Sequence, residues 1–160
     1  MEIKGISETS ATLLKLVPAF SQEYILSKNM YTVLDNHEAV CEFFRSQFAG
    51  EINEKIKVAC LDDRLRLICC DELSEGTISS VKLDIKTLVK YIYKNNSESI
   101  IIAHNHPNGE LLPSDEDIRM TTEIYKKLKP IGIELIDHII VAKGQAISLK
   151  DIGAFALLNI

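Results

Sequence analysis

The sequence has no tryptophan, few prolines and no hydrophobic stretch long enough to cross a bilayer. Apolar stretches such as Ser99–Ala103 are far shorter than the roughly 20 residues that a transmembrane helix requires. The chain also lacks an N-terminal basic segment followed by an apolar core and a cleavage site of small residues. We therefore expect a cytoplasmic protein with no membrane partner.

Positive charge is also in deficit, because 18 Lys and Arg residues stand against 23 Asp and Glu, a net charge of −5. This balance disfavours non-specific binding to a phosphate backbone. Aromatic residues that can stack on single-stranded bases are few, with five Tyr and five Phe. We do not expect this chain to bind nucleic acid on its own.

The four cysteines show no Cys-x-x-Cys spacing of the kind that metal and redox motifs use. In a chain without an export signal, the expected role of such cysteines is that of small buried hydrophobic residues. They are Cys41, Cys60, Cys69 and Cys70.

A length of 160 residues with 46% hydrophobic and 26% charged residues is typical of one folded domain. Apolar residues at helical spacing predict an N-terminal helix or helix pair from Ser10 to Ser27, with a kink or break at Pro18. After a linker over Ser27–Asp35, a second helix is expected to begin after Asn36 and to stop at Gly50. We thus predict a helical arm over residues 1–35 and one domain over residues 36–160.

The domain is expected to be of the α/β class, with a mixed sheet and helices packed against it. Ser99–Ala103 is apolar on both faces, as a central buried strand should be. A helix of about fifteen residues is expected to open at Pro113-Ser114. The other expected elements are a hairpin over residues 55–70 with its turn at 62–64, a third strand over 77–83, a helix over 85–94, and strands over 133–141 and 146–149.

The segment after the central strand carries two histidines and a nearby carboxylate. His104 and His106 alternate in an extended chain, so both imidazoles can point toward one place. Asp117, in the first turn of the helix that Ser114 opens, can add an oxygen ligand, and two nitrogens with one oxygen suit a catalytic zinc site. Ser114-x-x-Asp117 is also a helix cap, and His138 is an alternative third ligand.

This segment resembles a known family. His-x-His, seven residues, Ser, two residues and Asp is the motif of the JAMM (MPN-type) zinc metalloproteases, and HNHP-x-G followed by PS-x-x-D resembles the RadC-like branch. Residues 75–78 and 136–141 also look like RadC segments, so the resemblance covers about residue 50 to Gly153. It implies a JAMM/MPN-like (cytidine deaminase-like) fold, in which helices sandwich a mixed sheet.

The resemblance also implies roles for individual residues. Zn²⁺ would be held by His104, His106 and Asp117, and Ser114 would help to stabilise the oxyanion of a tetrahedral intermediate. A glutamate from an early strand would act as general base, which points to Glu54, with Glu51, Glu72 and Glu75 as competitors. Two neighbours are given supporting roles: Asn105 is expected to order the loop by side-chain hydrogen bonds, and His138 to lie in the core or directly behind the ligands.

The implied function is zinc-dependent hydrolysis of a peptide or isopeptide-like bond in an unidentified peptide or protein. Two alternatives remain open: a DNA-repair-associated module and a catalytically silent scaffold with the same fold. The support for the first is a stripe of lysines at i, i+4 spacing together with a second group of lysines, Lys86, Lys90 and Lys94 with Lys126, Lys127 and Lys129. The arm is interpreted as the remnant of a helix-hairpin-helix region, and a homodimer is one alternative for the assembly.

Overall fold

The computed structural model describes residues 7–28, 32–73, 75–77 and 80–157. The chain divides into two units, Met1–Thr32 and Val33–Ile160. The first unit is built on one helix, α1 (Glu8–Lys28), which contains Pro18 in its interior, so the described part of the arm is a single helix and not a pair. Among the described residues, no helix has both the length and the apolar character that a bilayer-spanning segment needs.

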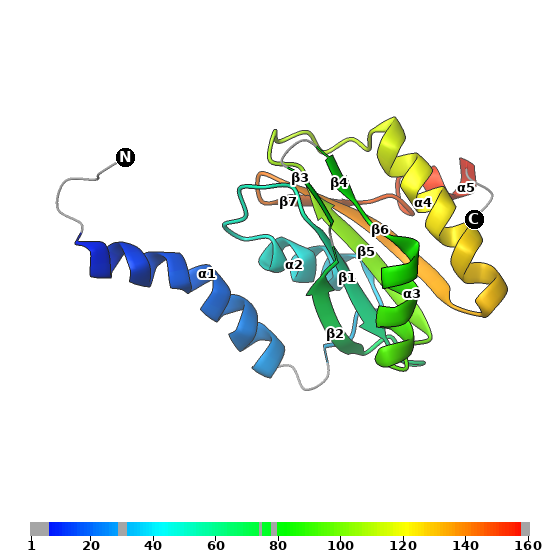
Figure 1. Cartoon of the computed structure of the whole chain (residues 1–160), viewed down its shortest axis with the longest axis horizontal. Helices are drawn as coiled ribbons and strands as arrows, with labels where there is room; N and C mark the ends of the chain where they lie inside the picture. Colours follow the sequence, from blue (N-terminus) through cyan, green and yellow to red (C-terminus); the bar gives the residue numbers. More distant parts are fainter. Residues whose placement is uncertain (1–6, 29–31, 74, 78–79, 158–160) are drawn as a thin grey trace. The chain divides into compact units, whose positions relative to one another are not determined.

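The second unit is a mixed sheet with helices on its faces (Figure 1). Its strands run in the order β2-β1-β5-β6-β7, and all neighbours are antiparallel except the parallel pair β5 and β6. The strands are β1 (Ile56–Leu61), β2 (Leu67–Glu72), β3 (Glu75–Thr77), β4 (Ser80–Lys82), β5 (Ser99–Asn105), β6 (Glu134–Ala142) and β7 (Gln145–Ser148). The helices are α2 (His37–Gln47), α3 (Ile85–Lys94), α4 (Asp115–Leu128), the short 3-10 turn η1 (Lys129–Ile131) and α5 (Ala154–Leu157).

The two faces of the sheet pack against different helices. Ile100 and Ile102 share a core with Leu88 of α3 and with Ile124 and Leu128 of α4. On the other side α2, which buries two phenylalanines and a valine, packs against β6 and β7. Every residue of β5 is buried, which explains why its residues 100–103 are all apolar, without alternation.

The structure confirms the α/β class and the mixed sheet. The hairpin of β1 and β2 and the central position of β5 were expected, and α2 begins after Asn36, whose side chain accepts a hydrogen bond from Ala39 N. The helix α4 follows Ser114 as expected.

Two sequence-based expectations were wrong in detail. Residues 77–83 do not form a strand of the main sheet, since Glu75–Thr77 and Ser80–Lys82 pair with each other as a separate two-stranded unit. Such local pairing closes a shorter loop than docking on the edge of the sheet. The expected linker over residues 27–35 is also too long, because Val33 forms a β-bridge with Arg66 and Leu34 is buried. Its residues 29–31 lie outside the described part.

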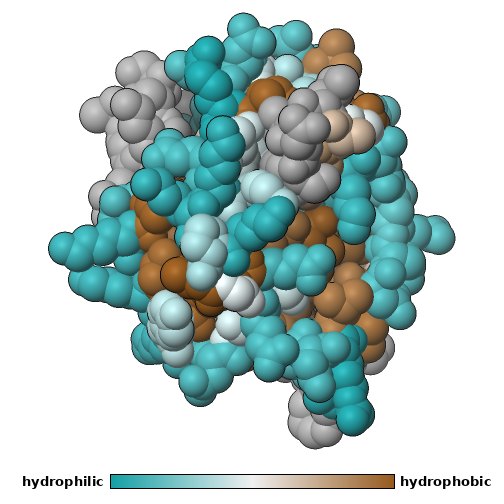
Figure 2. Space-filling view, turned by 90° about the vertical axis from the view of Figure 1, so that its right-hand side faces the viewer, coloured by the Kyte–Doolittle hydropathy of each residue, from teal (hydrophilic) through white to brown (hydrophobic). Residues whose placement is uncertain are grey.

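The face of the molecule that lies at the right in Figure 1 is covered mainly by hydrophilic side chains, with apolar residues visible between them (Figure 2). The helix α4 explains part of this surface, because its sequence alternates charged residues with a buried stripe that includes Ile124 and Leu128. An amphipathic helix of this kind covers a sheet with one face and meets water with the other.

Candidate metal centre

His104 is the penultimate residue of β5 and is held from both sides. It pairs in register with Ile56 of β1 and Ile140 of β6, and it is only 1% exposed. Because side chains alternate along a strand, its imidazole shares the α3 and α4 face with Ile102. His106 follows directly, and its N–H donates to Val141 O at 2.8 Å, which keeps the chain beside β6 after the strand ends.

Asp117 is fixed at the start of α4 by a capping box. Ser114 Oγ accepts from Asp117 N at 3.2 Å, while both Ser114 N and Ser114 Oγ donate to Asp117 Oδ2 at 2.7 Å. This arrangement satisfies backbone donors at the helix start. It also leaves the second carboxylate oxygen, Oδ1, free of the cap and facing His104.

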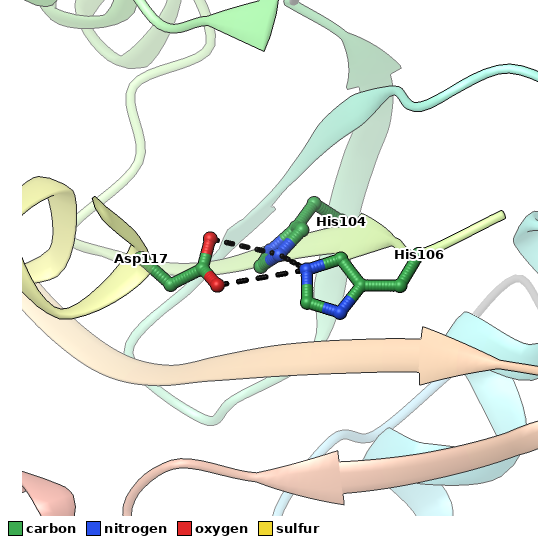
Figure 3. A group of neighbouring side chains, drawn as sticks. All are labelled: His104, His106 and Asp117. Carbon is green, nitrogen blue, oxygen red and sulfur yellow. Dashed lines mark hydrogen bonds and ion pairs between the residues drawn. The ribbon is translucent and has the colours of Figure 1, made fainter. Parts of the chain in front are cut away.

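The three side chains converge on one point (Figure 3). His104 Nε2 lies 2.8 Å from His106 Nε2 and 3.0 Å from Asp117 Oδ1, and His106 Nε2 lies 3.5 Å from Asp117 Oδ2. One ligand atom from each residue falls within 4.8 Å of the others. These three residues can therefore hold a metal ion.

His138 lies behind His104 and not among the converging atoms. Its Nε2 is 2.8 Å from His104 Nδ1, and its Nδ1 is 2.6 Å from Thr121 Oγ1. Burial, together with the neighbouring His104, lowers the pKa of His138 well below its usual value. The preceding Asp137 accepts from His138 N, Ser148 Oγ and Lys150 N, which anchors β6 to β7.

The loop after His106 turns back over the site. His106 Nδ1 lies 2.6 Å from Glu110 O. Gly109, at φ +85°, has the left-handed backbone that favours glycine. The side chain of Lys143, from the β6–β7 turn, lies where a Cβ at Gly109 would be.

Glu54 lies just before β1 and lines the same cavity as the three converging residues. Its two neighbours are held by Asn105, which accepts from Lys55 N and donates to Asn53 O, each at 2.8 Å. The side chain of Asn105 thus orders the segment that carries Glu54, a more specific arrangement than the expected ordering of its own loop.

Two of the competing glutamates are engaged elsewhere. Lys55 Nζ lies 3.0 Å from both Glu51 Oε2 and Glu72 Oε2, and neither carboxylate is among the residues that line the cavity. Glu75 belongs to β3, and its side chain is outside the described part.

The cavity has a volume of about 740 Å³ and is largely acidic. Among the described residues that line it, four glutamates accompany Asp117, and the only Lys or Arg is Arg119, which lies 3.8 Å from Glu116. The glutamates are Glu54, Glu110, Glu116 and Glu123.

The protonation of the converging groups follows from their contacts. The hydrogen bond with Asp117 raises the pKa of His106 above its usual value. Burial alone would raise the pKa of Asp117, but its contacts with His104 and His106 and the hydrogen bond from Ser114 lower it well below its usual range. Asp117 is therefore ionised and available as a ligand at neutral pH.

The sequence predicted that His104, His106 and Asp117 lie together, and the structure places them together. The sequence did not point to Thr121, which contacts His138 behind them. Thr121 lies one helical turn after Asp117 and shares its buried face. The i, i+4 spacing was a usable signal, but an interior threonine on a helix is unremarkable without its partner His138.

A buried strand of a mixed sheet that ends in His-x-His, with a helix-capping aspartate facing it, defines an α/β domain with a candidate metal centre. The chain belongs to the family described as the RadC-like JAB domain, whose model matches residues 34–154.

Curated relatives carry the name UPF0758 protein. One from Stenotrophomonas maltophilia (strain K279a) is 33% identical over 119 residues, which are 74% of this chain and 51% of that protein. One from Rhodobacter capsulatus is 30% identical over 153 residues, 95% of this chain and 72% of the relative. One from Finegoldia magna is 32% identical over 151 residues, which are 94% of this chain and 68% of that protein. The chain thus spans about half the length of the Stenotrophomonas relative.

Proposed function

We propose that this chain is a zinc-dependent amide hydrolase of the JAMM class, which cleaves a peptide or isopeptide-like bond. The observation that carries the proposal is the convergence of His104 Nε2, His106 Nε2 and an Asp117 oxygen within 4.8 Å inside a cavity. Two nitrogens and one oxygen, with room for a further ligand, match the donor set of catalytic zinc sites.

The hydrogen bonds around His106 fit a bound cation. A carbonyl oxygen only accepts, so His106 Nδ1 must donate to Glu110 O across their 2.6 Å contact. In the neutral imidazole, Nε2 then carries a lone pair, which faces the Asp117 carboxylate and His104 Nε2. A metal ion satisfies such converging acceptors, and imidazole with carboxylate suits zinc.

When bound, zinc would supply a Lewis acid that polarises the substrate carbonyl and acidifies water. Glu54 is the proposed general base: a carboxylate oxygen takes a proton from the attacking water and returns it to the leaving amine. Its support is its place in the cavity and the clamp that Asn105 forms on Asn53 and Lys55.

Ser114 is proposed to serve the site in two ways. Its N–H and hydroxyl orient Asp117 through Oδ2, which keeps the other oxygen directed at His104. For the oxyanion role, the hydroxyl would turn from Asp117 toward the substrate, since Ser114 also lines the cavity. Donors of this kind contribute on the order of 10²–10³ in rate elsewhere.

The charge of the cavity supports an amide substrate over a phosphodiester. Among the described lining residues, four glutamates and one arginine accompany the three candidate ligands. This excess of negative charge repels a phosphate backbone. A peptide segment with neutral or basic residues meets no such repulsion.

The test is metal content and peptide cleavage measured on the same preparations. Purified without chelator, the wild type should hold about one zinc ion per chain, and His104→Ala, His106→Ala and Asp117→Ala should lose it. His37→Ala is the matched control, because His37 is an exposed residue of α2 that pairs with Asp151. A folded wild type without zinc would contradict the proposal.

The catalytic step has its own pair of variants. Glu54→Gln should retain zinc and abolish cleavage of a peptide library, whereas Glu51→Gln, whose carboxylate pairs with Lys55 outside the cavity, should retain both. Zinc binding without cleavage of any peptide would favour the silent scaffold.

The second candidate function is association with DNA. Its support is a surface hollow where Lys86 and Lys90 of α3 and Lys127 of α4 outnumber the two acidic lining residues, Asp84 and Glu123. If these lysines bind phosphates, reversing Lys86 and Lys90 to Glu should weaken binding to a duplex and reduce its salt dependence. Unchanged binding would exclude this surface.

A further inference from the structure

A chain of hydrogen bonds lies behind the candidate metal ligands and joins β5, β6 and α4. His104 Nδ1 is 2.8 Å from His138 Nε2, and His138 Nδ1 is 2.6 Å from Thr121 Oγ1. Thr121 Oγ1 in turn donates to Asp117 O at 2.6 Å. Both ends of this chain of hydrogen bonds belong to candidate ligands, and Asp117 Oδ1 lies 3.0 Å from His104 Nε2.

The direction of these hydrogen bonds can be read from one fixed end. The carbonyl of Asp117 has no proton, so the hydroxyl of Thr121 must donate to it. That hydroxyl has a single proton, and only its lone pairs remain for His138. His138 Nδ1 must therefore carry a proton and donate to Thr121 Oγ1.

The proton on His138 Nδ1 also determines which nitrogen of His104 is the donor. His138 is fully buried, and the hydrogen bonds of its ring nitrogens go to Thr121 and His104 and not to a carboxylate. An imidazole in such surroundings is neutral, so His138 Nε2 is an acceptor. His104 Nδ1 must then be the donor, and its other nitrogen, Nε2, is left with a lone pair that faces Asp117 and His106.

We propose that Thr121 and His138 are positioning residues that hold His104 in the tautomer whose Nε2 lone pair is directed at the metal. The inference rests on the proposed metal site and adds two residues to it. Partners of this type fix the ring orientation and raise the basicity of a ligating histidine. Because Thr121 lies one turn after Asp117, these hydrogen bonds also connect α4, which carries Asp117, to β5, which carries His104.

Two substitutions at Thr121 separate the hydroxyl from the shape of the side chain. Thr121→Val keeps the branched shape and removes the hydroxyl that accepts from His138 Nδ1 and donates to Asp117 O, whereas Thr121→Ser keeps the hydroxyl. Zinc affinity, measured by competition with a chromophoric chelator, should fall about tenfold to a hundredfold in Thr121→Val and stay within about threefold of wild type in Thr121→Ser. Equal affinities of wild type and Thr121→Val would overturn the inference.

A second measurement needs neither a variant nor a metal. Long-range ¹H–¹⁵N spectra of the imidazoles in the metal-free chain should show His138 protonated at Nδ1 only and His104 protonated at Nδ1. A proton on His138 Nε2 would overturn the proposed direction. If the wild type binds no zinc, the proposed function fails. The spectra still decide whether the hydrogen bonds through His138 set the tautomer of His104.

Discussion

Asn105 holds the backbone of Lys55, fifty residues earlier in the chain, by accepting a 2.8 Å hydrogen bond from its N–H. The same side chain donates to Asn53 O at 2.8 Å, so it brackets Glu54. The last residue of β5 therefore connects the strand that presents His104 with the segment that presents the candidate general base.

Replacing Asn105 should loosen this segment without removing the metal. Asn105→Ala leaves Lys55 N–H without its acceptor, so we expect faster amide hydrogen exchange at Lys55 and a wild-type zinc content. If Glu54 is the base, kcat should fall about tenfold to a hundredfold, because small misplacements of a reacting group are costly. Asn105→Asp, which keeps the acceptor for Lys55, should protect that amide as wild type does. Unchanged amide exchange at Lys55 in Asn105→Ala would show that the Asn105 side chain does not hold this segment.

Zinc affinity should weaken as the pH falls. Contact with Asp117 raises the pKa of His106 in the metal-free chain, so the proton that competes with the metal at His106 binds at a higher pH than for an unperturbed histidine. Below that pKa, affinity should drop about tenfold per pH unit for one competing proton. Chelator competition between roughly pH 8 and pH 5 measures this slope, and a flat profile would contradict the assignment of His106 as a ligand.

Ser114→Ala should destabilise the metal-free domain. The variant loses the acceptor for Asp117 N and one of the two donors to Asp117 Oδ2, and loss of such a cap costs about 0.5–2 kcal/mol. Urea denaturation monitored by circular dichroism measures the difference. Ser114→Thr retains the hydroxyl and is the control, expected within about 0.5 kcal/mol of wild type. Equal stability of Ser114→Ala and wild type would show that the cap contributes nothing.

Gly109→Ala should cost about as much as Gly144→Ala, about 1–2 kcal/mol each. Both glycines have a left-handed backbone, at φ +85° and +75°. A Cβ at Gly109 would meet the end of the Lys143 side chain, whereas one at Gly144 would meet nothing within 4 Å. Because the end of a lysine side chain moves at little cost, backbone strain should dominate at both sites. A much larger loss in Gly109→Ala, measured by thermal unfolding, would mean that Lys143 is held in place.

Local patterns were sufficient for the elements that present the ligands. The apolar run before His104 indicated a buried strand, and Ser114-x-x-Asp117 indicated a helix start, since a strand period of two and a helix cap are properties of neighbouring residues. Residues 77–83 were misassigned because a local strand pattern does not state which strand it pairs with, and here Ser80–Lys82 pairs with Glu75–Thr77.

The sequence by itself determined the α/β class and the candidate ligands, two histidines that can point toward one place and an aspartate on the following helix. Each of these depends on spacing along a short stretch of chain. Only the tertiary structure decided that Asn105 reaches Asn53 and Lys55, that His138 stands behind His104, and that Thr121 joins it to Asp117. Apart from the contact of Thr121 with Asp117 within α4, these contacts join segments far apart in the chain. They depend on strand order and register, which hydrophobic patterning alone does not specify.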